Sequence, residues 1–195
     1  MKYLYQQYGL VNFKQLIKDA QNKHYCLLHI NCINFDWIKT SLIAANENRS
    51  PIILAVSDSA LKYFGTHETY VKLVSNAIKA YNITIPVVAH LDHGSYESAK
   101  SAIKARFNLV MFDGRHLPFE ENNEKTKEIL ALAAEYGCAI EAEVGSIGVK
   151  EDNVDGGDGE LADPVECKKL LNLGLIYYLQ ELAIFMEFIQ LIERN

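Results

Sequence analysis

Two short segments of the sequence bring together residues that can bind a metal ion and move protons. The first, residues 90–93 (HLDH), holds two imidazoles and one carboxylate. Both groups are common ligands of divalent metals, and a carboxylate beside a metal can serve as an acid or a base. Alternation along a strand places His90 and Asp92 on one face, with His93 where the strand ends. Taken alone, the segment fits a metal site and a hydrogen-bonded core histidine with a helix-capping aspartate equally well.

The second segment contains a pair of glutamates, Glu141 and Glu143, at alternate positions of another predicted strand. Their carboxylates therefore share one face. Because an isolated carboxylate is costly to bury, the pair needs a cation, a hydrogen-bond network or raised pKa values. Other predicted strands end at Asn31, Ser57 and Asp113. Parallel α/β folds place ligands at the C-terminal edge of the sheet, so these groups predict one shared site.

The elements that must position these residues alternate regularly along the chain. Five β-branched or apolar runs indicate strands, and segments with helical periodicity lie between them. The predicted strands are 25–31, 51–57, 85–91, 109–113 and 139–145, and the predicted helices are 35–48, 66–81, 95–106, 123–136 and 164–171. This order is typical of βα units around a parallel sheet, and we expect a single domain because no linker-like stretch interrupts it.

Composition narrows the class of protein further. The 195 residues are 49% hydrophobic and 23% charged, which suits a sizeable core and excludes a disordered or collagen-like chain. The formal net charge of -6 leaves no basic surface for nucleic acid or for an anionic membrane. The N-terminus lacks a secretory signal, and the most apolar stretch, 170–192, contains carboxylates that are costly inside a bilayer. We therefore expect a cytoplasmic protein with reduced cysteines.

The two acidic segments resemble the signature segments of a known enzyme family. Residues 88–94 (VAHLDHG) and 140–148 (IEAEVGSIG) are similar to those of class II, metal-dependent fructose-bisphosphate aldolases. The resemblance also takes in segments 31–37, 50–57, 111–114 and 162–164 and runs to about Gly174. It implies an α/β fold, a (β/α)8 TIM barrel. With 195 residues against about 250 for a whole barrel, we expect an incomplete one of about five βα units with an atypical C-terminal tail.

The resemblance implies a zinc ion and the reversible cleavage of fructose 1,6-bisphosphate to dihydroxyacetone phosphate and glyceraldehyde 3-phosphate, a glycolytic reaction. Zinc would polarise the ketone oxygen and stabilise the enediolate. By the same resemblance, His93 would be a zinc ligand and Glu143 an auxiliary ligand. Asp92 would be catalytic and would move the proton on the hydroxyl of the aldehyde-derived half.

Three further residues receive roles from the resemblance. Glu151 would be the catalytic acid/base that enolises dihydroxyacetone phosphate, and Asn31 and Ser57 would contact the substrate. Glu151 lies in the glycine-rich segment 150–160, for which a mobile lid is favoured over an acidic solvated connector. Val149 departs from the small residue usual in the family there. Four histidines receive no family role and are expected to be structural or surface residues: His24, His29, His67 and His116.

The sequence departs from the family after Gly174. The resemblance implies two more zinc histidines, in segments similar to GNIHG and HGGSG, and neither segment occurs in this sequence. Codons for residues 180–191, read in a shifted frame, are compatible with GIGNIHGIYPTN, which contains one missing histidine. We therefore expect residues 1–174 to be a partial aldolase barrel domain and residues 175–195 to be a frameshifted tail. Resequencing the gene around the Gly174 codon tests this, and an uninterrupted frame would contradict it.

Three functional interpretations stay open at this point. The chain is a fructose-bisphosphate aldolase, a tagatose-bisphosphate type of ketose-bisphosphate aldolase, or a non-catalytic fragment without a complete zinc site. For the chain as it stands the fragment is favoured over activity. The expected partner is a small sugar bisphosphate, with no nucleic acid and no membrane, and full-length relatives are expected to form homo-oligomers.

Overall fold

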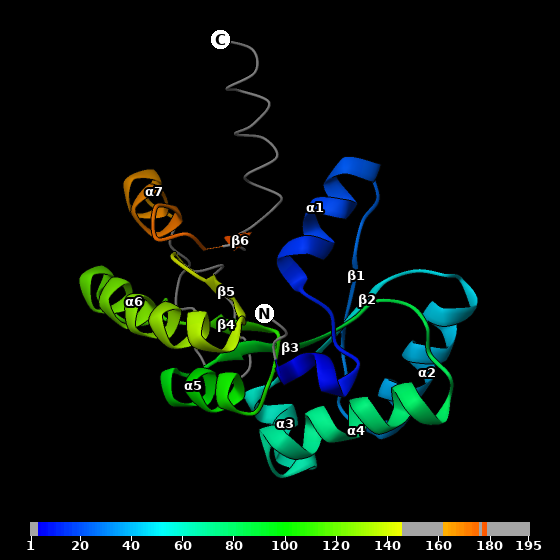
Figure 1. The fold of residues 1–195 in the computed structure, drawn as a ribbon. Coiled ribbons are helices and arrows are strands. Elements are labelled where there is room, and N and C mark those ends of the chain that lie inside the picture. The colour runs from blue at the N-terminus through cyan, green and yellow to red at the C-terminus, as the bar shows by residue number, and fades with distance from the viewer. Residues whose placement is uncertain (1–3, 146–161, 176, 179–195) are drawn as a thin grey trace.

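Six parallel strands form one sheet in the computed structural model of this chain, which describes residues 4–145, 162–175 and 177–178 (Figure 1). The strands lie side by side in sequence order. They are β1 (Leu28–Asn31), β2 (Ile52–Ser57), β3 (Val87–Gly94), β4 (Leu109–Phe112), β5 (Ala139–Ala142) and β6 (Tyr177–Tyr178). Strands β2, β4 and β5 are buried along almost their whole length, as parallel strands are when both faces of the sheet are covered.

Helices connect the strands, and most begin at a residue whose side chain accepts a hydrogen bond from the first turn. The helices are η1 (Leu4–Tyr8), α1 (Phe13–Lys23), α2 (Phe35–Glu47), α3 (Asp58–Phe64), α4 (His67–Ala80), α5 (Tyr96–Lys104), α6 (Phe119–Tyr136) and α7 (Pro164–Leu171). The capping residues of α1 to α5 are Asn12, Asn34, Ser57, Thr66 and Ser95. These short polar side chains satisfy backbone N–H groups that would otherwise lack a partner at each helix start.

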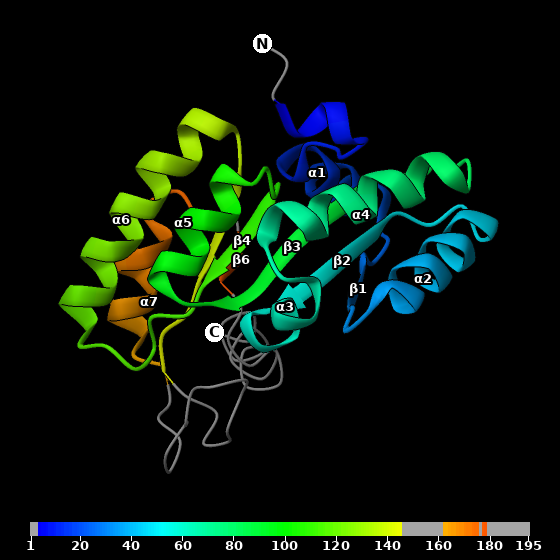
Figure 2. The same ribbon diagram turned by 90° about the horizontal axis from the view of Figure 1, so that it is seen from below.

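Two apolar clusters pack against opposite faces of the sheet. Alternate strand residues such as Ile52 and Leu54 face the larger cluster, which also contains buried residues of α2, α4, α5 and α6. The residue between them, Ile53, belongs to a second cluster with Phe13 and Leu16 of α1. Figures 1 and 2 show α1 on the side of the sheet opposite α3, α4 and α5. We call the face of the sheet that carries the second cluster the inner face and the opposite face the outer face. Helix α1 therefore covers part of the inner face.

This architecture confirms the predicted α/β fold, an incomplete (β/α)8 barrel with a parallel sheet. The boundaries differ in places: β1 begins at Leu28 rather than residue 25, and β3 continues to Gly94 rather than ending at residue 91. Helices α1 and α3 were not predicted, although the three-to-four-residue spacing of the buried Phe13, Leu16 and Ala20 in α1 is a helical pattern. The short β6 pairs with β5 and lies within the predicted tail. In the part of the chain that is described, every helix is too short or too polar to cross a bilayer.

Asn108 ties three segments together at the start of β4. Its side chain is buried, its Oδ1 accepts the N–H of Ala89 at 2.8 Å, and its Nδ2 donates to the carbonyl of Val11 at 2.6 Å. The substitution Asn108→Ala removes both partners from buried backbone groups, so we expect it to lower the free energy of unfolding by about 2–4 kcal/mol. Urea denaturation measures this loss. The matched change Asn76→Ala, on the exposed side of α4, should stay within about 0.5 kcal/mol; equal losses for both variants would contradict the bridging role.

Candidate functional site

The inner face of the sheet changes from apolar to polar along the strands. Ile53, Val88, Leu109 and Ala139 belong to the cluster under α1. Because side chains alternate between the two faces, the residues two and four positions further along share that inner face. Those positions hold, in the order β2 to β5, Ala55 and Ser57, His90 and Asp92, Met111 and Asp113, and Glu141 and Glu143. Since the strands are parallel, the polar residues gather at their C-terminal ends, as predicted.

Asp92 is close to both predicted substrate-contact residues. Its Oδ2 accepts a hydrogen bond from Nδ2 of Asn31 at 2.8 Å, and its Cα is the register partner of Ser57 on the neighbouring strand. The Ser57 hydroxyl also accepts the N–H of Ala60 at 3.3 Å, so it caps α3. Burial by itself raises the pKa of Asp92, but His90 and Asn31 hold that pKa below its usual 3.8. Asp92 is therefore an ionised carboxylate that can accept a proton.

His90 is a buried, hydrogen-bonded histidine. Its Nδ1 lies 2.8 Å from Nε2 of His29, and its Nε2 lies 3.3 Å from Oε2 of Glu141. Burial alone lowers the pKa of His90, but the Glu141 carboxylate raises it above its ordinary value. Burial of the His29 ring and the charge on His90 lower the pKa of His29. His90 is thus joined to His29 by a hydrogen bond through Nδ1 and faces the Glu141 carboxylate through Nε2.

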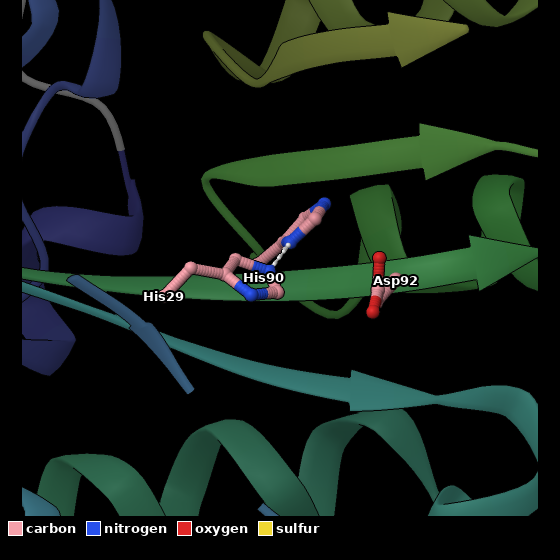
Figure 3. A group of neighbouring side chains, drawn as sticks. All are labelled: His29, His90 and Asp92. Atoms are coloured by element: carbon pink, nitrogen blue, oxygen red, sulfur yellow. Dashed lines mark hydrogen bonds between the residues drawn. The ribbon is translucent and has the colours of Figure 1, made fainter. Parts of the chain in front are cut away.

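Figure 3 shows the two imidazoles joined by this hydrogen bond, with Asp92 further along β3. The core-histidine interpretation is therefore confirmed for His90. Asp92 does not cap a helix, because the N-cap of α5 is Ser95. One ligand atom each of His29, His90 and Asp92 lies within 4.8 Å of the others, close enough for one metal ion. Hydrogen bonds join His90 to His29 and Asp92 to Asn31 within this group of strands.

A β-bulge brings His93 onto the same face as His90 and Asp92. The pairing of β3 with β4 shifts between Leu91 and Gly94, where three steps along β3 match two steps along β4. Without the extra residue, alternation would place His93 on the outer face with Leu91. His93 has a φ of 48°, an uncommon value for a non-glycine residue, and it lies within this irregularity. A Cβ at Gly94 would lie 2.4 Å from Leu91 Cδ2, so the bulge also needs a glycine there.

His93 meets two buried carboxylates. Its Nδ1 lies 3.1 Å from Oδ2 of Asp113 and 3.5 Å from Oε2 of Glu143. The burial of its ring lowers the pKa of His93, but the hydrogen bond to Asp113 and the nearby carboxylates together raise that pKa to about 9. The ligand atoms of all three residues lie within 4.8 Å of one another. One imidazole nitrogen and two carboxylate oxygens form a donor set that suits a zinc ion.

Arg115 contacts the same two carboxylates. Its Nε lies 3.4 Å from Oδ2 of Asp113, and its Nη1 lies 3.2 Å from Oε1 of Glu143. Its side chain is 1% exposed, so the guanidinium is buried with its partners. We use the name inner acidic group for His93, Asp113 and Glu143. Of the alternatives left open for the buried Glu143 carboxylate, the chain itself therefore supplies a cation.

The structure brings five predicted site residues to one edge of the sheet: Asn31, Ser57, Asp92, His93 and Glu143. It adds His29 and Arg115, for which no site role was predicted, and it brings in Asp113 and Glu141, which were expected at this edge without individual roles. Positions at strand ends predicted that Asp113 and Glu141 lie at this edge, but nothing in the spacing singled out His29 or Arg115. The remaining prediction, Glu151, and the expected lid lie in 146–161, outside the described residues.

Comparisons with known proteins agree on one group of relatives. Residues 11–184 match the family model "Fructose-bisphosphate aldolase class-II". The chain is 47% identical over 164 residues to a fructose-bisphosphate aldolase of Mycoplasma pneumoniae and 42% identical over 164 residues to one of Geobacillus stearothermophilus. These alignments cover 84% of this chain and 57% of each relative. The chain thus spans little more than half the length of these curated relatives.

The fold has solved counterparts among proteins described as aldolases. The crystal structure of a protein from Coccidioides immitis, assigned as a fructose-1,6-bisphosphate aldolase, superposes with a TM-score of 0.75 at 28% identity and covers 86% of this chain and 59% of that one. The YdjI aldolase of Escherichia coli K12 gives a TM-score of 0.69 at 28% identity, with coverage of 87% and 63%. Both likenesses therefore take in most of this chain.

Proposed function

Because the chain belongs to the class II fructose-bisphosphate aldolase family, we propose that it takes part in the zinc-dependent cleavage of fructose 1,6-bisphosphate into dihydroxyacetone phosphate and glyceraldehyde 3-phosphate. One observation carries this proposal: His93 of the inner acidic group and the ionised Asp92 are adjacent residues that the bulge turns to the same face. A metal ligand and a proton acceptor therefore stand side by side, as an aldol cleavage requires.

Different residues of the chain would hold the metal ion and move the proton. The donor atoms of His93, Asp113 and Glu143 fit a single zinc ion, with His93 and Glu143 in the roles that the family suggests. When bound, zinc supplies a Lewis acid that withdraws electron density from the substrate carbonyl.

Asp92 would take the proton from the hydroxyl of the aldehyde-derived half. As that hydroxyl becomes a carbonyl, the carbon–carbon bond breaks and its electron pair stays with the ketone-derived half. The Asn31 amide, which donates to Oδ2 of Asp92 at 2.8 Å, leaves Oδ1 to accept the proton and fixes the direction of the carboxylate. Ser57, on the adjacent strand, would contact the substrate at the same edge of the sheet. Glu151 would be the acid/base that enolises dihydroxyacetone phosphate.

The substrate, the pathway, the cellular location and the oligomeric state are also proposals. Fructose 1,6-bisphosphate is preferred because the similar proteins of M. pneumoniae and G. stearothermophilus are named fructose-bisphosphate aldolases. Tagatose 1,6-bisphosphate is the second candidate, because the described residues include no group that we can assign to one sugar. We also propose a role in glycolysis, a cytoplasmic location and a homo-oligomer, in keeping with a metabolic enzyme of this family.

Zinc content and retro-aldol rate, measured on the purified chain, test the proposed function. We expect about one zinc ion per chain. A coupled assay for glyceraldehyde 3-phosphate should detect cleavage of fructose 1,6-bisphosphate. EDTA should abolish this cleavage, and added zinc should restore it. A parallel assay with tagatose 1,6-bisphosphate separates the two substrates. Protein that stays zinc-free after addition of zinc and cleaves neither sugar would support the non-catalytic fragment instead.

A further inference from the structure

Arg115 places a permanent positive charge against the inner acidic group. A guanidinium does not lose its proton inside a protein, whereas a histidine or a water molecule can. Asp113 and Glu143 are 1% and 3% exposed, so each is too deeply buried to rely on solvent to balance its charge. The contacts of 3.4 Å to Asp113 and 3.2 Å to Glu143 give both carboxylates a cation that belongs to the chain.

The same oxygen atom serves two partners. Oδ2 of Asp113 faces both Nδ1 of His93, at 3.1 Å, and Nε of Arg115, at 3.4 Å. A zinc ion on the inner acidic group would bind carboxylate oxygens at about 2.0–2.2 Å, and Oδ2 is the Asp113 atom that faces His93. The guanidinium would then stand close to a doubly charged ion in a buried setting, where like charges repel strongly. The ion and Arg115 therefore compete for Asp113 and Glu143.

We propose that Arg115 is a resident cation that sets the metal affinity of the inner acidic group. Divalent metal enters this group only as the guanidinium gives up its contact with one or both carboxylates. The inference rests on the proposed function for the identity of the ion, zinc, and it adds a residue that determines occupancy. Arg115 acts through the carboxylates, so it is a positioning residue and not a catalytic one.

The opposite role for Arg115 gives a result of opposite sign. Hydrogen-bonded groups behind metal ligands can orient those ligands, and their loss then weakens metal binding by about 10- to 100-fold. A positive charge on a ligating carboxylate instead withdraws electron density and repels the ion. Competition therefore predicts tighter metal binding once the charge is removed, whereas orientation predicts weaker binding.

The experiment measures zinc affinity by competition with a chromophoric chelator on the full chain, at one pH and one ionic strength. Arg115→Gln and Arg115→Met should each bind zinc at least about tenfold more tightly than the unmodified chain. Arg115→Lys, which keeps the charge, should stay close to the unmodified chain. Arg49→Gln removes the same charge from an exposed residue before β2, at the far end of the sheet, and should leave the affinity unchanged.

Two further measurements assign the gain to this group. Adding Asp113→Asn to the Arg115→Gln variant should abolish the gain, and circular dichroism on each variant confirms that the fold is kept. Having two uncharged replacements keeps the test valid if one of them fails to fold. Unchanged or weaker zinc binding in a folded Arg115→Gln or Arg115→Met variant overturns the proposal. The readout is zinc binding, so a chain without retro-aldol activity, which would end the proposed function, leaves this comparison intact.

Discussion

We expect the substitution Asp92→Asn to lower the retro-aldol turnover of the chain about a thousandfold and to leave its zinc content unchanged. Asparagine has nearly the shape of aspartate and can keep a hydrogen bond with Asn31, but it cannot accept the proton of the substrate hydroxyl. Proton transfer by a positioned side chain contributes about 10²- to 10⁴-fold to a rate, which sets the expected loss. The coupled assay gives the turnover, and metal analysis of the same sample gives the zinc content.

The control for this variant is Asp36→Asn, which removes a carboxylate from the exposed first turn of α2. It should retain full turnover. An Asp92→Asn protein with turnover within a few-fold of the unmodified chain would remove Asp92 from proton transfer. A variant that also lost its zinc would show that Asp92 supports the metal site. Background turnover in the unmodified chain counts against the proposed function and says nothing about Asp92.

The substitution His93→Ala removes zinc from the chain, with an expected loss of affinity of at least about a hundredfold. His93 is the only imidazole of the inner acidic group, and its Nδ1 faces both carboxylates at 3.1 and 3.5 Å. Without it, two oxygen donors remain, fewer than the three protein ligands usual at a catalytic zinc. Chelator competition measures the affinity, and turnover should fall with it.

His116→Ala is the matched control, because His116 is exposed and lies one residue beyond Arg115. It should bind zinc as the unmodified chain does. Full zinc binding in His93→Ala would move the metal to another group, and His29, His90 and Asp92 would then be the first residues to test. Comparing His93→Ala with Asp92→Asn therefore separates metal binding from proton transfer at two neighbouring residues.

The sequence was sufficient to predict the order of the strands and the edge of the sheet at which polar residues gather. Both follow from local patterns: buried β-branched runs indicate strands, and parallel strands end at one edge. The shared face of Glu141 and Glu143 was predicted for the same reason. Helix α1 was missed because its role is tertiary: Phe13 and Leu16 cover the inner face of strands that come later in the chain.

The partners within the site could not be predicted from local patterns. Arg115, beyond the end of β4, and His29, within β1, reach the site from different strands, and their contacts depend on how the strands are aligned. His29 joins His90 across 61 positions of sequence. A pattern of residue types along one segment contains no information on such a contact, so charge balance inside the site becomes visible only in three dimensions.

The bulge in β3 changes which residues of the segment HLDH face the same side of the sheet. Along a regular strand, only residues separated by an even number of positions can look into the same site. His90 and Asp92 obey this parity, but His93 is an odd number of positions from His90. An odd interval between two side chains that must cooperate therefore reports an inserted residue, and the glycine at position 94 marks where the strand changes phase. In a regular strand that kept His93 three positions after His90, His93 would turn to the outer face with Leu91 and leave the site without any change in its identity.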